Sequence, residues 1–354
     1  MQVVRGLVAL VVCAMSGVTP AGAYPLERAP VLDLGATMTS TKHLRDAELL
    51  ASDKPFTVRV PFEWSDPAHV AEQRMEVVRA AADRNWRIVV NLRYRAPKSA
   101  AGPELLSGFG SWASETASRV AALAPASFDV SNRPNSLVPD DPGSDPAWTA
   151  SVLVAGVQAV SQTVPDARVG FSWLATGDPV EDAAWWAVIR SMGRELLSPV
   201  SFVDVQLFPG TLTVGTPWAL GGPRDQVSQI LRQTRSIYMP RAGLGPEIDI
   251  EVGEFGGHAG QYDDTFPLDV AQPDAEALIA TQAAQRRLLE AVLEGVRDAA
   301  MSSRVTSAVW TSLADEGGCS LAKCWGLLTE SGAPRSAFDE MRYQIIRASL
   351  ARNS

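Results

Sequence analysis

The stretch from residue 56 to residue 92 decides the fold. It begins with the β-rich run FTVRVPF at 56–62, continues through a helical pattern at 67–84, and ends in the β-rich run RIVVNL at 87–92. The same alternation recurs along the chain. Further β-rich runs lie at 31–34, 128–131, 168–173, 202–208, 248–252 and 305–310. The other helical patterns lie at 42–51, 110–122, 146–163, 182–195, 224–236, 275–298 and 335–350.

Strands that alternate with helices pair in parallel. Eight such units predict a single (β/α)8 barrel, whose active site lies at the carboxyl ends of the strands. The alternative is an open doubly wound sheet, which usually carries a Gly-rich phosphate-binding turn after its first strand. The corresponding residues at 34–38 read LGATM and lack that motif. The barrel is therefore the favoured fold.

The composition is that of a globular protein. Hydrophobic residues make up 46% and charged residues 20%, so a largely disordered chain is excluded. Lys and Arg number 31 against 40 Asp and Glu, which gives a net charge of −9. An acidic chain without a basic block is a poor candidate for binding nucleic acid. Three His and three Cys leave little material for a metal site, and we predict neither a metal nor a cofactor.

The first 23 residues have the pattern of a signal peptide. Arg5 supplies a positive charge, residues 7–12 are the first part of an apolar run, and AGA at 21–23 has the form of a cleavage site. A membrane anchor and a lipoprotein box at Cys13 are the alternatives, but the apolar run is too short to span a bilayer. We expect 1–23 to be removed and 24–354 to form one secreted domain without membrane insertion.

Cleavage would leave two cysteines, Cys319 and Cys324. In an exported chain, two cysteines this close in sequence usually pair. A metal would need more ligands than these two. We therefore predict a Cys319–Cys324 disulfide.

Two strand ends carry the polar residues expected of a barrel active site. The fourth run continues as FDVSNRPN at 128–135, and the seventh continues as IEVGEFGG at 250–257. They resemble the fourth- and seventh-strand motifs, W-N-E-P-N and T-E-F-G, of the (β/α)8 superclan of retaining glycoside hydrolases. That superclan includes the cellulase-like and β-xylosidase/α-L-iduronidase-like families. The stretches VDVQLFPG at 203–210 and GLLTESGAPRSAF at 326–338 are similar to further motifs of these families.

The resemblance implies a carbohydrate partner, either a polysaccharide or a glycoconjugate. Retaining hydrolysis needs two carboxyl groups, one to attack the anomeric carbon and one to protonate the leaving oxygen. Glu254 matches the attacking carboxylate, and Glu251 is its rival on the same strand. Asn132 would bond the sugar 2-hydroxyl and Trp310 would stack on a sugar ring. The remaining implied substrate-binding residues are Arg59, Arg133, Gln206 and Phe208.

The sequence departs from the family at the second carboxyl group. Arg133 stands where the family has its acid/base Glu, and a guanidinium cannot act as a general acid. Gln206 and Phe208 replace the family's His and Tyr. We predict that Arg133 reaches Glu254, lowers its pKa and blocks standard hydrolysis. Candidates for a relocated acid are Glu63 first, and then Asp140, Asp141, Asp315 and Glu316.

Two classes of function remain open. One is a hydrolase or transglycosidase with Glu254 as nucleophile and a relocated or missing acid. The other is a non-catalytic glycan-binding protein that keeps the cleft. Aromatic side chains near strand ends could stack on sugars in either case. Besides Trp310, these are Trp64, Trp218 and Trp325.

Overall fold

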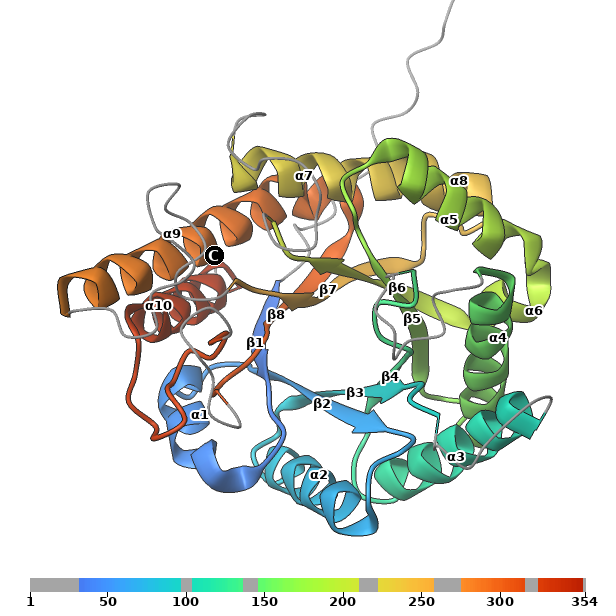
Figure 1. Ribbon diagram of the computed structural model, residues 1–354, viewed down its shortest axis with the longest axis horizontal. Coiled ribbons are helices and arrows are strands. Elements are labelled where there is room, and N and C mark those ends of the chain that lie inside the picture. Colours follow the sequence, from blue (N-terminus) through green and yellow to red (C-terminus); the bar gives the residue numbers. More distant parts are fainter. Residues whose placement is uncertain are drawn as a thin grey trace, which may run out of the picture.

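The computed structural model describes residues 32–96, 104–135, 146–209, 222–257, 275–315 and 324–352. Eight parallel strands close into one barrel in chain order (Figure 1). Because β1 also pairs with β8, the open sheet is excluded and the predicted (β/α)8 barrel is confirmed. The strands are β1 (Asp33–Thr37), β2 (Thr57–Glu63), β3 (Arg87–Arg93), β4 (Ser127–Val130), β5 (Arg168–Leu174), β6 (Val200–Leu207), β7 (Asp249–Phe255) and β8 (Val305–Trp310).

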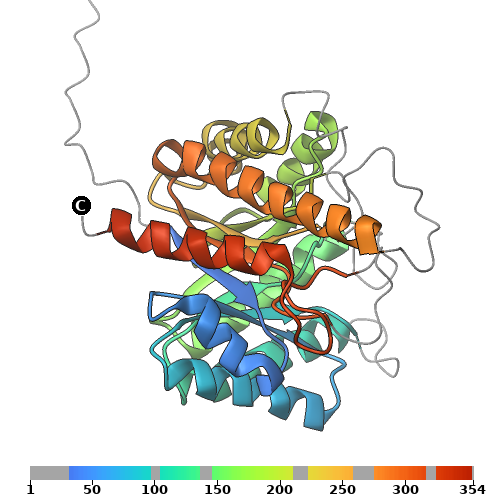
Figure 2. The ribbon, with the colours of Figure 1, turned by 90° about the vertical axis from the view of Figure 1, so that its left-hand side faces the viewer.

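Helices form a ring around the barrel, and α9 and α10 run side by side along one flank (Figure 2). The helices are α1 (Leu44–Ala51), α2 (Ala68–Ala82), α3 (Glu104–Ala121), α4 (Pro146–Thr163), α5 (Pro179–Ser191), α6 (Gly193–Leu197), α7 (Pro223–Gln233), α8 (Met239–Ala242), α9 (Ala275–Ser303) and α10 (Ser336–Ala351), with single turns at Thr41–His43 and Thr234–Tyr238. The helix predicted at 182–195 divides at Gly193, whose φ of +57° is left-handed. Among the described helices, none is long and apolar enough to cross a membrane.

The barrel wall separates apolar from polar side chains. Successive residues of a strand point to opposite faces. On β2, Val58 and Val60 belong to the hydrophobic core, whereas Arg59 between them makes its contacts with acids of other strands inside the barrel. On β6, Asp204 likewise lies between two buried valines. The interior of the barrel near the carboxyl ends of its strands is therefore polar.

Glu251 closes the opposite end of the barrel. Its carboxylate pairs with Arg87 and Arg168, the first residues of β3 and β5, and accepts a hydrogen bond from Ser307. The Arg168 Nη1 to Glu251 Oε1 distance is 2.9 Å. Glu251 therefore lies away from the carboxyl ends of the strands and is excluded as the rival to Glu254.

One extra residue in β7 turns Glu254 into the barrel. Asp204 and Gln206 of β6 pair with Glu251 and Glu254, so two steps along β6 match three along β7. The pairing with β8 shows the same irregularity after Val252. This is a β-bulge, which re-aims the side chains beyond it. Without it, strict alternation from the inward-facing Glu251 would turn Glu254 outward.

Gly253 is the residue that the bulge needs to be small. A Cβ at this position would lie 2.3 Å from the carboxylate oxygens of Asp204, which also accepts the Gly253 N–H at 2.7 Å. That carboxylate is fully buried and ion-paired with Arg59, so it has little freedom to move aside.

Replacing Gly253 with Ala should lower the free energy of unfolding by roughly 1–3 kcal/mol, because it overpacks a fixed neighbour. Urea denaturation would measure the change. Gly110→Ala on α3 is the matched control, since its Cβ would meet only ordinary contacts, at 3.6 and 3.8 Å. A Gly253→Ala protein as stable as the control would contradict this account of the bulge.

Candidate active site

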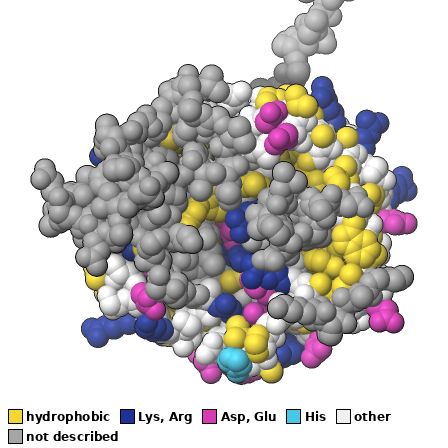
Figure 3. All heavy atoms as spheres, viewed as in Figure 1, with side chains coloured by type: hydrophobic (Ala, Val, Ile, Leu, Met, Phe, Trp, Pro, Cys, Tyr) yellow, Lys and Arg dark blue, Asp and Glu magenta, His cyan; other side chains and the backbone are white. Residues whose placement is uncertain are grey.

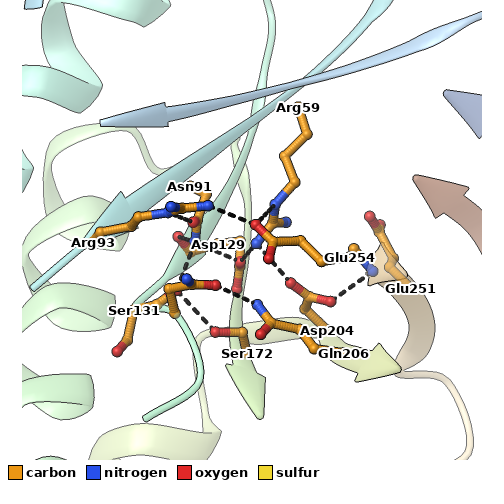
Figure 4. Close-up of polar contacts among 12 residues, drawn as sticks. Arg59, Asn91, Arg93, Asp129, Ser131, Ser172, Asp204, Gln206, Glu251 and Glu254 are labelled. Atoms are coloured by element: carbon orange, nitrogen blue, oxygen red, sulfur yellow. Dashed lines mark hydrogen bonds and ion pairs between the residues drawn. The ribbon is translucent and has the colours of Figure 1, made fainter. Parts of the chain in front are cut away.

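A buried guanidinium links four strands near their carboxyl ends (Figure 4). Arg59 of β2 has no exposed surface. Its Nη2 donates a hydrogen bond to Asp129 Oδ2 at 2.6 Å and lies 2.9 Å from Asp204 Oδ2. Its Nε lies 3.4 Å from Glu254 Oε1. The three carboxyl groups come from β4, β6 and β7, so one cation holds these strand ends together.

Asp129 and Asp204 both contact the same nitrogen of Arg59, Nη2. Burial raises the pKa of Asp129 well above its ordinary value, and the neighbouring Asp204 carboxylate raises it further, against the lowering effect of Arg59. Burial also raises the pKa of Asp204. Because like charges this close disfavour double ionisation, the pair binds a proton more readily than separate exposed aspartates would.

Arg93, the last residue of β3, makes the direct contact with Glu254. Its Nη2 donates to Glu254 Oε1 at 2.6 Å, and its Nε donates to Asn91 at 2.7 Å. Glu254 is only 2% exposed. Burial alone would raise the pKa of Glu254, but the positive charges of Arg93, Arg59 and Arg133 together lower it. Glu254 is therefore an ionised carboxylate, as a nucleophile has to be.

The predicted pairing of Arg133 with Glu254 is wrong, although the predicted lowering of the Glu254 pKa is correct. No hydrogen bond or ion pair joins these two described residues, and Arg133 acts on Glu254 only through its charge. The physical reason is that Arg93 and Arg59 already occupy the positions next to the carboxylate. Arg93 was missed because it stands one residue beyond the β-rich run at 87–92. Its place at a strand end, two residues after Asn91, was the available signal.

The segment after β4 is held in an unusual backbone conformation. Ser131 and Arg133 have φ values of 71° and 45°, which are rare for residues other than Gly. The Ser131 carbonyl accepts hydrogen bonds from Asn91 at 2.5 Å and from Ser172 at 2.8 Å. Asn132 is buried and accepts a hydrogen bond from Gln206 at 2.6 Å. The structure thus brings the predicted residues Asn132 and Gln206 together.

Glu63 also lies at this end of the barrel. Its carboxylate is 3.1 Å from Arg95 and 3.7 Å from Arg93. Arg93 therefore lies between Glu63 and Glu254. Among the less favoured acids, Asp315 is buried, pairs with Arg335 and accepts a hydrogen bond from the Gly326 N–H. Asp140, Asp141 and Glu316 lie outside the described residues.

The predicted aromatic residues pack near the ends of β6 and β8. Trp310 is fully buried, its ring meets Phe255 edge-on, and its N–H donates to the Trp325 carbonyl at 2.9 Å. Phe208 meets the Trp325 ring edge-on. These contacts fix the rings in place, and stacking on a sugar stays a prediction. Half-buried Trp64 packs with Tyr94 and Phe109, and Trp218 lies outside the described residues.

Two further predictions, the Cys319–Cys324 disulfide and the signal peptide, involve residues that the structure does not describe. Cys324 is buried, but Cys319 lies outside the described residues, so their disulfide stays a prediction. The proposed signal peptide at 1–23 also lies outside them.

Two cavities adjoin the strand ends. One of about 370 Å³ is bordered by Thr37 at the end of β1 and by Leu313 to Asp315 after β8. The other, of about 300 Å³, is bordered by Pro134, Asn135, Thr176 and Trp185. Figure 3 looks onto this end of the barrel, where basic and acidic side chains are visible together near the middle of the face. Within the described ranges, no group of three or more His, Cys, Asp or Glu side chains is arranged to hold a metal ion.

No family model and no curated protein matches this sequence. Solved structures nevertheless share its fold. A fungal β-1,4-galactanase is similar over 88% of this chain and 99% of its own, with a TM-score of 0.64 and 14% identity. GH5_18 from Streptomyces cattleya, in complex with GlcNAc, is similar over 90% of this chain and 81% of its own, with a TM-score of 0.62 and 16% identity.

An exo-β-1,4-mannosidase from Opitutaceae bacterium strain TAV5 is similar over 92% of this chain, with a TM-score of 0.61 and 14% identity. The similar region covers 61% of that enzyme's own chain. At these identities the likeness shows the fold alone. The chain has the single (β/α)8 barrel that these glycoside hydrolases share.

Replacing Arg93 with Gln should raise the pKa of Glu254, because it removes the guanidinium in direct contact with the carboxylate. Carbon-13 NMR titration of the Glu254 carboxyl would measure the change. Arg95→Gln is the control, since Arg95 pairs with Glu63. An unchanged titration of Glu254 in Arg93→Gln would show that this contact does not set its charge.

Replacing Asp129 with Asn should make stability less sensitive to pH. A carboxyl group whose folded pKa is raised stabilises the fold at low pH, and that contribution is lost as pH rises through the folded pKa. Asn mimics the protonated form and has no proton to lose. Unfolding by urea between about pH 4 and about pH 7 should therefore favour the variant progressively over the wild type as pH rises. The control is Asp83→Asn at an exposed position, and equal pH profiles for Asp129→Asn and wild type would contradict the raised pKa of Asp129.

Proposed function

We propose that this protein is exported and binds a polysaccharide or glycoconjugate at the carboxyl end of its barrel, without standard retaining hydrolysis. The observation that carries the proposal is Arg133, which follows β4 where the resembling families have their acid/base Glu. The solved neighbours support a carbohydrate ligand, since their names describe β-galactanase, β-mannosidase and β-glucosidase. Export rests on the signal-peptide pattern at 1–23.

The surroundings of Glu254 argue against standard retaining hydrolysis. Such a site needs an ionised nucleophile and a protonated carboxylic acid within roughly 5–5.5 Å of each other. Glu254 supplies the first. Arg133 cannot supply the second, because a guanidinium does not release its proton near neutral pH. Asp129 carries a raised pKa, but it is fully buried and bonded to Arg59.

Binding needs no acid, and the polar groups for it remain. Asn132 and Gln206 present amides at the ends of β4 and β6. Arg133 and Glu63 are half-buried, so both keep some contact with solvent. The two adjoining cavities, of about 370 and 300 Å³, fall within the size range of small-ligand sites. These features support a glycan-binding role.

A hydrolase with Glu63 as its acid is the second candidate. The observation in its favour is that Arg93 contacts both Glu63 and Glu254, which puts the two carboxylates at one guanidinium. Against it, the two described side chains that form ion pairs with Glu63, Arg93 and Arg95, are both cations, whereas the acid of such sites lies in an apolar pocket.

We expect the purified protein to bind components of a glycan array and to leave natural, unactivated polysaccharides uncleaved in a hydrolysis screen. Replacing Arg133 with Glu would restore the missing carboxyl group and should yield measurable hydrolysis if the rest of the cleft is competent. Reducing-end assays on the bound glycans would measure both proteins.

Robust wild-type hydrolysis that Glu254→Gln abolishes would contradict the proposal and point to the second candidate. Glu63→Gln would then test the relocated acid. The matched control is Glu76→Gln on the exposed face of α2, which makes the same chemical change away from the barrel mouth. Absence of binding to any glycan would remove the proposed function altogether.

A further inference from the structure

The ion pairs around Arg59 form one connected set. We define the Arg59 cluster as the residues joined, directly or through a shared carboxylate, to Arg59 or Arg93 by these contacts: Arg59, Arg93, Arg95, Glu63, Asp129, Asp204 and Glu254. Its three guanidinium groups face four carboxyl groups. Each of these carboxyl groups pairs with at least one of the three guanidinium groups. The described contacts of the cluster are therefore formed without Arg133.

Arg133 stands beside the Arg59 cluster, and none of the described acidic side chains forms an ion pair with it. It forms no hydrogen bond or ion pair with any residue that the structure describes, and its buried Nε lacks a hydrogen-bond partner. Glu181 borders the neighbouring cavity but makes no ion pair with Arg133. A half-buried cation without a partner is costly, since its lost hydration is not replaced.

Hydrogen bonds on both sides of Arg133 hold the backbone of this segment in place. Asn132 is tied to β6 through Gln206. Two residues after Arg133, the Asn135 amide donates to the Leu174 carbonyl at 2.7 Å and accepts the Leu174 N–H at 2.8 Å. Arg133 itself adopts a left-handed φ of 45°, which persists only where the surroundings impose it. A ligand that binds Arg133 therefore does not have to order this backbone, which would cost entropy.

Room for a ligand lies directly beside this segment. The cavity of about 300 Å³ is bordered by Pro134 and Asn135, the two residues that follow Arg133, and by Trp185. Arg133 itself does not border this cavity, whereas the acidic Glu181 does. The apolar part of the lining suits the apolar face of a sugar ring, and an anionic group on that sugar would have to meet the Arg133 guanidinium outside the cavity. Arg offers a planar pair of donors that matches a carboxylate, sulfate or phosphate group.

We infer that Arg133 selects anionic glycans by binding a carboxylate, sulfate or phosphate group on the sugar. The inference rests on the proposed glycan-binding function and adds the chemical class of the ligand. The overall field of a protein of net charge −9 does not favour anionic ligands, so a preference for them would have to come from a local cation such as Arg133.

The test compares matched glycans on wild type and Arg133 variants. The probes are oligogalacturonate, a sulfated galactan and a phosphorylated mannan, each beside its neutral counterpart with the anionic group reduced or removed. The three anionic arms distinguish uronate, sulfate and phosphate as the source of the charge. Biolayer interferometry at low and high salt gives the dissociation constants. The variants are Arg133→Gln, Arg133→Lys and Arg79→Gln, the last being a charge-matched control on exposed α2.

We expect wild type to bind at least one anionic probe about tenfold or more tightly than its neutral counterpart, as one charge-assisted contact allows. Arg133→Gln should bind the anionic and neutral probes about equally, Arg133→Lys should keep part of the preference, and Arg79→Gln should behave as wild type. Added salt should weaken the preference, because it screens partly exposed charges.

The outcomes separate this inference from the proposed function. Equal binding of anionic and neutral glycans, or a preference that survives in Arg133→Gln, would overturn the anionic ligand and leave glycan binding intact. Failure to bind any probe or any array glycan would overturn both. Thermal unfolding of each variant checks the fold, and Arg133→Lys provides a conservative substitution if Arg133→Gln is unstable.

Discussion

The burial of Arg59 is the constraint on which the strand ends depend. Taking one guanidinium and three carboxyl groups out of water costs several kcal/mol per ion unless each finds partners. The barrel supplies them from β4, β6 and β7, and Asn91 of β3 adds a hydrogen bond to Asp129 at 2.8 Å. Removing any one partner would leave a buried charge without compensation and would destabilise the fold, so these residues act as a unit.

This arrangement changes what Glu254 can do. In a two-carboxyl retaining site the electrostatic environments differ, so that one group is an acid and the other a nucleophile. Here guanidinium groups contact Glu254. The carboxyl group with the strongly raised pKa, Asp129, is fully buried and bonded to Arg59. The described ion pairs at these strand ends are therefore formed without Arg133.

The sequence predicted the barrel well because the alternation of strands and helices is a local pattern. Glu254, Asn132 and Gln206 could be placed by motif, since each stands at or near a strand end. Arg93 and the aspartates on β4 and β6 could not be assigned roles, because their contacts join strands far apart in the chain. The prediction of an Arg133–Glu254 contact failed for the same reason. A single Arg-for-Glu exchange shows which groups are present, but not which cation contacts the carboxylate.

The bulge in β7 has a consequence for reading related chains. Along a strand, odd and even positions face opposite sides, and one added residue exchanges the two sides for every position that follows. Counting from Glu251 by twos assigns the wrong side to Glu254 and Phe255, although each lies only a few residues away. A one-residue deletion between 251 and 254 would therefore preserve the sequence from Glu254 to Gly257 and still move the Glu254 side chain from the barrel interior to the helical layer. In such strands, the length of the segment is as informative as its residues.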